Sequence, residues 1–426
     1  MGSNPASPTI TTFCLVFTFS KSQELGDNVK LANRLDRLGT ETAFAVAATA
    51  ADWLSKGNEV FPFHLGDINL PTPANISAAM QRAVAEGKTG YCPNAGIAPL
   101  RLALAESLGK QRNVVFAPEN IAVQPGGKPV IGKFLRAVMN PGDEVLYPNP
   151  GFPIYESQIE FNDGIAVPYR YLDTANGFQI DLDYLKSKIN NKTKALILND
   201  QQNPLAAEMT DAERQALADL ANKHNLWVLS DEAYFDIRYA GESKSIVSLA
   251  GMQDRTVILY TFSKKFAMTG WRLGAAIGPR EIVDRISKLN TNEESCTAQF
   301  VQWAGVEAIN GDQSGANELV RILKLRRDAT IAGINKVSGM RVHTPNSAFY
   351  VFPEVSETMK RTGHTDVGEF ALAALHNSGM SFCTRRHFGR PAPDEKGNYI
   401  RLAYSGIDNE KIEKGLSRLA AWVSSK

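Results

Sequence analysis

The sequence predicts an α/β protein with a mostly parallel sheet flanked by helices in a large domain, followed by a smaller α+β domain. From about residue 120, short apolar runs alternate with amphipathic stretches, which is typical of a parallel sheet that helices cover on both faces. After about residue 300, the helical patterns become longer and the strand patterns shorter. Because domains typically hold ~100 to 200 residues, a chain of 426 residues should form two such units.

Six apolar runs are the expected strands of the large domain. They cover residues 121–124, 144–147, 195–198, 226–230, 256–261 and 274–278. One connecting helix begins after Thr210, because Glu213 stands three residues later, as in a capping box, and apolar residues follow at helical spacing. The segment 195–230 is therefore expected to form a strand, helix, strand unit.

Longer helical patterns mark the smaller domain. Helices are expected at residues 315–337 and 410–423, with short strands around 347–352 and 398–404. Residues 31–57 read as one further helix, which we expect to dock on the smaller domain. The expected boundaries are a flexible N-terminal arm at 1–30, the large domain at 60–305, and the small domain at 31–59 and 306–426.

Composition and charge favour a small-molecule partner. With 46 basic and 45 acidic residues the net charge is +1, which gives no electrostatic basis for binding nucleic acid or an anionic membrane. The longest purely apolar run near the N-terminus, FCLVF, is far shorter than the ~20 residues that span a bilayer. The four cysteines lie far apart without C-x-x-C spacing, so we expect no metal site, no disulfide framework and a cytoplasmic location.

Polar and aromatic residues follow five of the expected strands. The segments are PGGKP (125–129), NPGFP (149–153), DQQNP (200–204), DEAY (231–234) and SKKF (263–266). In an open parallel sheet, ligands bind outside the carboxyl ends of the strands, where these segments would meet. Each segment alone has an ordinary explanation, since Asp231 would serve as a helix N-cap and Asn203 as a turn residue. Gly126 and Gly127 would form a turn, or bind a phosphate between strand and helix.

Taken together, these segments resemble the class I and II aminotransferases of the pyridoxal-phosphate fold type I family. The most specific piece is SKKFAMTGWRLG (263–274), which matches the family pattern S-K-x-F-x-M-T-G-W-R-x-G. The similarity runs from about Leu31 through nearly the whole chain. It implies a seven-stranded sheet, pyridoxal 5'-phosphate as the cofactor, and transfer of an amino group from an L-amino acid to a 2-oxo acid. The order of motifs also fits: YCPNAGIAPLR, PGGKP, NPGFPIY, NP, DEAY, the lysine motif and IRLAY.

The resemblance also implies the catalytic groups. Lys264 would form a Schiff base with the cofactor, whereas Lys265 would be a solvated or ion-paired side chain. Asp231 would pair with the pyridine nitrogen and so make the ring an electron sink. Tyr234 and the Asn203 amide would hydrogen-bond to the phenolate oxygen of the ring.

By the same resemblance, the phosphate would lie on the backbone of Gly127 and Lys128 at a helix N-terminus, beside Thr261 and Arg272. Phe152 would stack on the pyridine face.

Substrate contacts and a second subunit are implied as well. Arg401 would grip the substrate α-carboxylate, which Gly66 and Asn203 would also approach. Tyr91 resembles the tyrosine that reaches the phosphate of the neighbouring subunit, so we expect a homodimer with shared active sites.

Three segments depart from the family pattern: the first would lie beside the cofactor ring and alter loop geometry more than chemistry, and the other two would line the substrate entrance. They are NPLA (203–206) in place of N-P-T-G, GDINL (66–70) in place of G-x-P-D-F, and CTRRHFG (383–389) in place of a small, glycine-rich loop. Arg385, Arg386 and His387 would either recognise a side-chain carboxylate or form a solvated basic turn, and we favour the turn.

Three other functions are alternatives to an aminotransferase. A lyase, cyclase or oxygen-using enzyme of this fold would keep every residue named above. A pyridoxal-binding transcription regulator needs a basic DNA-binding unit before the fold, and the residues before about 60 are too few and too neutral to supply one. A nucleotide-binding Rossmann protein would carry G-x-G-x-x-G between a strand and a helix, which this sequence lacks.

Overall fold

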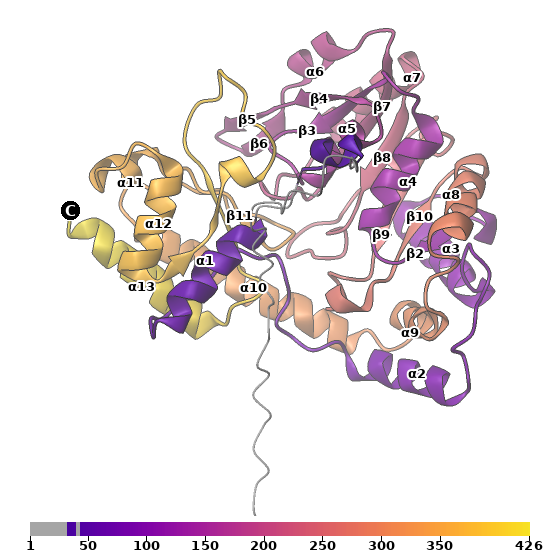
Figure 1. Ribbon diagram of the computed structural model, residues 1–426, viewed down its shortest axis with the longest axis horizontal. Helices are drawn as coiled ribbons and strands as arrows, with labels where there is room; N and C mark the ends of the chain where they lie inside the picture. The colour runs from indigo at the N-terminus through magenta and orange to yellow at the C-terminus, as the bar shows by residue number, and fades with distance from the viewer. Residues whose placement is uncertain (1–31, 40–42) are drawn as a thin grey trace, which may run out of the picture.

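The computed structural model describes residues 32–39 and 43–426, which form two units lying side by side (Figure 1). The arm predicted at residues 1–30 lies outside the described residues. The larger unit contains a seven-stranded sheet, and the smaller unit a three-stranded one. Within the described ranges, none of the helices has the length and apolar character needed to cross a membrane.

The seven-stranded sheet of the larger unit is mostly parallel, which confirms the predicted fold class. Its strand order is β2, β10, β9, β8, β7, β3, β4. β10 runs antiparallel to both of its neighbours, and every other neighbouring pair is parallel. All six predicted strands are present. The strands are β2 (Ile121–Gln124), β3 (Glu144–Pro148), β4 (Ile165–Tyr169), β7 (Thr193–Asn199), β8 (Trp227–Asp231), β9 (Thr256–Thr261) and β10 (Gly274–Ile277).

Helices cover both faces of this sheet because its strands are apolar on both sides. In β7, Ala195 and Ile197 pack with α4, α5 and α8, whereas Leu196 and Leu198 pack with α6 and α7 on the opposite face. The helices of the unit are α2 (Ala74–Ala85), α3 (Ala98–Arg112), α4 (Lys128–Val138), α5 (Ile154–Phe161), α6 (Leu182–Lys188), α7 (Asp211–Lys223), α8 (Arg280–Glu293) and α9 (Gln299–Asn310).

The capping box predicted before α7 is present. Thr210 Oγ1 accepts a hydrogen bond from the Glu213 N–H (3.2 Å), and Glu213 Oε2 accepts one from the Thr210 N–H (2.8 Å). These bonds satisfy donors that the first turn of a helix leaves without partners. α7 then returns the chain to β8, which pairs in parallel with β7.

The edge strand β4 was missed by the sequence analysis. It contains Pro168, which cannot donate to a ladder and weakens the strand pattern. An edge strand tolerates proline because one of its sides makes no ladder hydrogen bonds.

The smaller unit packs helices on short strands. Its sheet has the order β11, β14, β13, and a separate pair joins β1 to β12. The strands are β1 (Phe61–Pro62), β11 (Tyr350–Val351), β12 (Met380–Ser381), β13 (Cys383–Thr384) and β14 (Ile400–Ala403). The helices are α10 (Ser314–Ile334), α11 (Ser356–Arg361), α12 (Val367–Ser378) and α13 (Asn409–Ser424). The hairpin of β5 (Tyr171–Thr174) and β6 (Gly177–Ile180) directly follows β4 and lies beside it on the larger unit (Figure 1).

The single helix predicted for residues 31–57 is wrong. The described part of this segment forms a short 3-10 helix, η1 (Asn33–Arg37), and a separate α-helix, α1 (Ala43–Ser55). Gly39 lies between them, and glycine is a poor helix former because it loses much backbone entropy on folding.

The two pieces of this segment contact different units. Arg37 pairs with Asp163 just after α5 (2.6 Å), and Gly39 O accepts a hydrogen bond from Ser157 Oγ (3.2 Å), so η1 lies on the larger unit. In contrast, α1 contacts β12 of the smaller unit. The segment therefore crosses from one unit to the other.

A buried ion pair ties the end of β8 to α3. Arg112 Nε donates to Glu232 Oε2 (2.6 Å), and the two side chains are 0% and 2% exposed. The hydroxyls of Ser230 and Ser245 also donate to Glu232, and the Arg112 guanidinium lies 4.0 Å from the ring centroid of Phe235. Because Glu232 directly follows β8, these contacts fix the carboxyl end of that strand.

We expect Arg112→Ala to lower the free energy of unfolding by about 3 to 5 kcal/mol, because it leaves the Glu232 carboxylate buried without its cation. The matched control is Arg321→Ala, which removes an exposed pair with Glu318 (2.7 Å) and should change stability little. Urea unfolding at one protein concentration measures both variants. Equal urea midpoints for the two would contradict the importance of the buried pair.

Candidate active site

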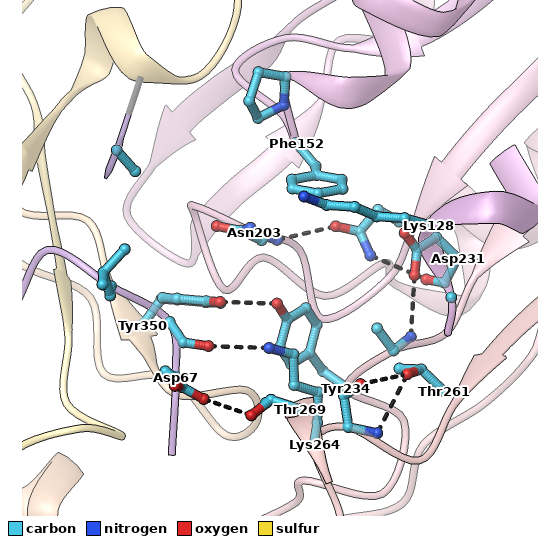
Figure 2. Close-up of a pocket in the computed structure, with 18 of the residues that line it drawn as sticks. Asp67, Lys128, Phe152, Asn203, Asp231, Tyr234, Thr261, Lys264, Thr269 and Tyr350 are labelled. Atoms are coloured by element: carbon cyan, nitrogen blue, oxygen red, sulfur yellow. Dashed lines mark hydrogen bonds between the residues drawn. The ribbon is translucent and has the colours of Figure 1, made fainter. Parts of the chain in front are cut away.

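A cavity of about 610 Å³ lies between the two units at the carboxyl ends of β8 and β9 (Figure 2). A volume of this size suits a small-molecule ligand. The cavity lies at the sheet edge where the sequence predicts a binding site. Among the residues that line it are Gly66, Gly127, Lys128, Phe152, Asn203, Asp231, Tyr234, Thr261, Lys264, Arg272 and Arg401.

The adjacent lysines that follow β9 have different surroundings. Lys264 lines the cavity, and its Nζ donates a hydrogen bond to Gly66 O (2.9 Å). Lys265 does not line the cavity, and it pairs with Asp236 (3.6 Å). Of the two, only Lys264 can therefore reach a ligand in the cavity.

Donors gather around the N-terminus of α4. Gly126 has a φ of +102°, and a Cβ at this position would lie 2.3 Å from Arg272 Nη2. Gly127 is the N-cap of α4, where the first backbone N–H groups of the helix are free of intrahelical bonds. Thr261 lies beside it, since a Cβ on Gly127 would be 3.3 Å from Thr261 Cβ. The result is a cradle for an anion, which the two glycines leave open.

An aromatic ring forms another part of the wall. Phe152 lines the cavity just before α5 and contacts Tyr155 edge-on, with 5.7 Å between ring centroids. The Lys128 Nζ lies 5.5 Å from the Phe152 centroid, and Figure 2 shows this side chain extending beneath the ring. Phe152 is thus held from two sides.

Asp231, the last residue of β8, is a buried carboxylate. Tyr155 Oη donates to Asp231 Oδ2 (2.6 Å), and the Ala233 N–H donates to Oδ1 (3.1 Å). Burial raises the pKa of Asp231 to about 6, while these two hydrogen bonds act in the opposite direction. Burial, and then the Asp231 charge, raises the pKa of Tyr155 well above its usual value, so the phenol remains a donor. A cationic group on a ligand would stabilise the carboxylate.

Arg401 joins the two units across the cavity. Its Nη1 donates to Asn203 Oδ1 (3.0 Å) and its Nη2 donates to His64 O (2.7 Å). Asn199 holds this arrangement from behind, because its Oδ1 accepts from the Asn203 N–H (3.0 Å) and its amide donates to Asp231 O (3.0 Å). Arg401 Nε is buried and has no hydrogen-bond partner within the described residues, so the guanidinium keeps donor capacity for a carboxylate.

Two tyrosines meet across the cavity. The hydroxyls of Tyr234 and Tyr350 form a hydrogen bond (2.8 Å), with Tyr350 contributed by β11 of the smaller unit. Burial raises the pKa of Tyr234 well above its usual value, so its hydroxyl stays protonated. A Cβ on Gly66 would lie 2.3 Å from Tyr350 Oη, so a glycine is needed there to admit the ring.

The basic turn at residues 385–387 is held by carboxylates of the same chain. Arg385 is 5% exposed and pairs with Glu395 (2.5 Å), so its interpretation as a solvated residue is wrong. Arg386 pairs with Asp366 (2.6 Å) and remains partly exposed, as expected of a surface turn. Of the three basic residues, only His387 lines the cavity.

Tyr91 is the predicted site residue that the cavity does not include, and its side chain is 89% exposed. Conversely, Tyr155, Asn199 and Tyr350 line the cavity but were missed by the sequence analysis. Tyr155 follows Phe152 by three residues, within the motif NPGFPIY. Asn199 directly precedes DQQNP (200–204) and accepts from the Asn203 N–H four residues later, so it also had a local signal. Tyr350 gave none, because its partner Tyr234 is distant in sequence.

These residues fit pyridoxal 5'-phosphate on three grounds. The cradle that a Cβ on Gly126 would fill suits the phosphate. The buried carboxylate of Asp231 suits a protonated ring nitrogen. The unpartnered buried Nε of Arg401 suits the carboxylate of an amino acid bound beside the cofactor.

Comparisons with known proteins agree with a site for pyridoxal 5'-phosphate. A family model described as aminotransferase class I and II matches residues 59–419. A probable aspartate/prephenate aminotransferase of Aquifex aeolicus is 33% identical over 396 residues, which cover 91% of this chain and 97% of the relative. An aspartate aminotransferase of Bacillus subtilis is 30% identical over 399 residues, with coverage of 93% and 99%. The structure of an aspartate aminotransferase from Thermus thermophilus with maleate has a TM-score of 0.85 and 29% identity, with coverage of 92% and 100%.

The pKa of Asp231 predicts a pH dependence of stability. Its value of about 6 in the fold exceeds the ordinary 3.8, so the folded state binds this proton more tightly. In the cofactor-free protein, Asp231 should therefore contribute stability that is complete below about pH 4 and lost as the pH rises through about 6.

Asp231→Asn cannot ionise and should not show this loss. The free energy of unfolding of Asp231→Asn minus that of the wild type should increase between about pH 4 and pH 7 and then level off. Urea unfolding across this pH range measures the difference. A difference that does not vary with pH would show that the carboxylate is not destabilised by burial.

Proposed function

Because the chain belongs to the class I and II aminotransferase family, we propose specific roles for the residues of its cavity. The protein is a pyridoxal-phosphate-dependent aminotransferase that moves an amino group from an amino acid to a 2-oxo acid. Similarity to named aminotransferases over nearly the whole chain disfavours a lyase, a cyclase or an oxygen-using enzyme.

The cofactor supplies a carbonyl that bonds amines and a ring that withdraws electrons from the substrate Cα. Its phosphate would be held by the backbone N–H groups of Gly127 and Lys128, the Thr261 hydroxyl and the Arg272 guanidinium. Phe152 would lie against the ring and fix its orientation.

The polar groups around the ring would set its charge. Asp231 would keep the ring nitrogen protonated, and Tyr155 would hold the Asp231 carboxylate in place through its hydrogen bond (2.6 Å). At the opposite edge, the Tyr234 hydroxyl and the Asn203 amide would donate to the ring oxygen.

The observation that carries the proposal is the position of Lys264. Its Nζ lies in the cavity 2.9 Å from Gly66 O, close to the proposed carboxylate site, so one amine can serve both cofactor and substrate. Lys264 would attach the cofactor and, once a substrate amine replaces it, accept the proton from the substrate Cα. A base must lie within hydrogen-bond reach of the proton that it takes, so a substrate held by Arg401 would have to present its Cα–H to Lys264 at that distance.

Arg401 would bind the substrate α-carboxylate with its planar guanidinium, together with Gly66 and Asn203. We propose aspartate as an amino donor, because several relatives are named aspartate aminotransferases. Conversion of the absorbance band of the bound cofactor by a panel of amino acids tests this choice. A band that leucine converts but aspartate does not would exclude aspartate.

Lys264→Ala should abolish the visible absorbance band of the bound cofactor and lower kcat/KM on the order of 10³-fold or more, because no other amine replaces it. Lys265→Ala is the matched control, because it removes the adjacent amine, which pairs with Asp236 outside the cavity. Absorbance spectra and steady-state rates of both variants show which of the two lysines binds the cofactor. If Lys265→Ala lost the band and Lys264→Ala kept it, the assignment would be reversed.

We also propose a homodimer in which Tyr91 completes the site of the partner subunit. The 89% exposed Tyr91 side chain lies outside the cavity of its own chain, and large exposed aromatic side chains are enriched at interfaces.

Hybrid dimers test this arrangement. Lys264→Ala and Tyr91→Ala should each be impaired alone. A hybrid of the two should contain one site with both substitutions and one intact site if Tyr91 acts on the partner. Activity after mixing and reassociation should then exceed that of either parent. If Tyr91 acted within its own chain, every hybrid site would carry one defect and mixing would give no gain.

A further inference from the structure

His387 stands at a position where this chain departs from the small, glycine-rich loop of the family. It follows the ion-paired residues Arg385 and Arg386, but it alone of the three lines the cavity. Its side chain is partly exposed, and it directly precedes Phe388, whose ring lies 4.7 Å from the Arg401 guanidinium carbon. His387 is therefore close to the group proposed to bind the substrate.

His387 Nδ1 contacts three polar groups of Thr384, which are its N–H (3.0 Å), its Oγ1 (3.0 Å) and its carbonyl oxygen (3.1 Å). The N–H can only donate, so this contact favours the tautomer that carries its hydrogen on Nε2, whereas the carbonyl oxygen would accept from the tautomer with the hydrogen on Nδ1. Burial lowers the pKa of His387, the backbone hydrogen bond with Thr384 raises it, and the charge of Arg401 lowers it further. The net shift of the pKa is downward, so the ring is neutral near pH 7.

Two other polar side chains that line the cavity, Tyr350 and Asp67, already have partners. Tyr350 is bonded to Tyr234, and the Asp67 carboxylate accepts from Thr269 Oγ1 (2.8 Å). Within the described residues, Nε2 of His387 makes no hydrogen bond. The apolar residues that line the same cavity include Phe44, Leu65 and Phe388, which directly follows His387.

We propose that His387 selects the amino donor by donating a hydrogen bond from Nε2 to an oxygen of the substrate side chain. The preferred substrates then carry a carboxylate or amide oxygen, and hydrocarbon side chains leave the donor unsatisfied. Because the donor is uncharged, aspartate and asparagine gain from it alike. This inference rests on the proposed function, since it requires an amino acid beside Arg401.

The structure offers a matched pair of variants. In His387→Asn, the side-chain oxygen can replace Nδ1 as acceptor for the Thr384 N–H, so the turn is kept while the donor that reaches the cavity is lost. In His387→Gln, a longer amide can return an N–H donor near the position of Nε2. Loss of one hydrogen bond to substrate should lower the kcat/KM ratio of aspartate to 2-aminobutyrate about tenfold in His387→Asn. His387→Gln should recover part of that ratio. The kcat/KM ratio of asparagine to 2-aminobutyrate should change in each variant by about the same factor as the ratio for aspartate.

Binding measurements separate this inference from the reaction itself. Calorimetry of the cofactor-loaded protein with succinate and butyrate, which differ by one carboxylate, should show a loss of affinity in His387→Asn for succinate relative to butyrate. Unchanged ratios in both assays, or an equal loss for all ligands, would overturn the role of His387. Failure of the proposed function would look different, because the wild-type cofactor band would then be converted by no amino acid while the calorimetric ratio still reported on His387.

Discussion

The cavity depends on how the fold supports a buried carboxylate at Asp231. Burial favours the neutral acid, and the Tyr155 hydroxyl and the Ala233 N–H offset only part of that effect. Both donors have fixed positions, because Tyr155 lies in α5 and Ala233 lies two residues after the end of β8. The Arg112–Glu232 pair holds the same strand end from the opposite side. The packing of two helices, α3 and α5, against one strand, β8, therefore sets the electrostatics of the site.

Hydrogen bonds between the two units complete the cavity. Each joins a residue in a connection between secondary-structure elements of the larger unit to a loop or strand of the smaller unit, so the polar network forms only when the units are docked. A small shift of one unit would change several of these contacts together. The bonds are Lys264 with Gly66, Tyr234 with Tyr350, Thr269 with Asp67, and Arg401 with Asn203.

The sequence predicted what is encoded locally and missed what distant segments create. Apolar runs along the chain predict the strands of the sheet, and a capping box predicts the helix after Thr210. Asp231 and Lys264 could be placed because each lies at or just after the end of a predicted strand. In contrast, Tyr350 approaches Tyr234 only after the smaller unit has docked, and Arg385 is buried where it donates to Asn149, which is distant in the sequence. No pattern along the chain records such contacts, because they depend on tertiary packing rather than on spacing.

Arg401 illustrates a thermodynamic consequence of this architecture. Its guanidinium is already oriented by Asn203 and His64, and it lies between the rings of Tyr350 and Phe388. A free arginine side chain has about 2 kcal/mol of rotamer entropy, most of which is lost here when the chain folds. A carboxylate that binds this preorganised arginine therefore need not immobilise it, and more of the interaction energy appears as affinity.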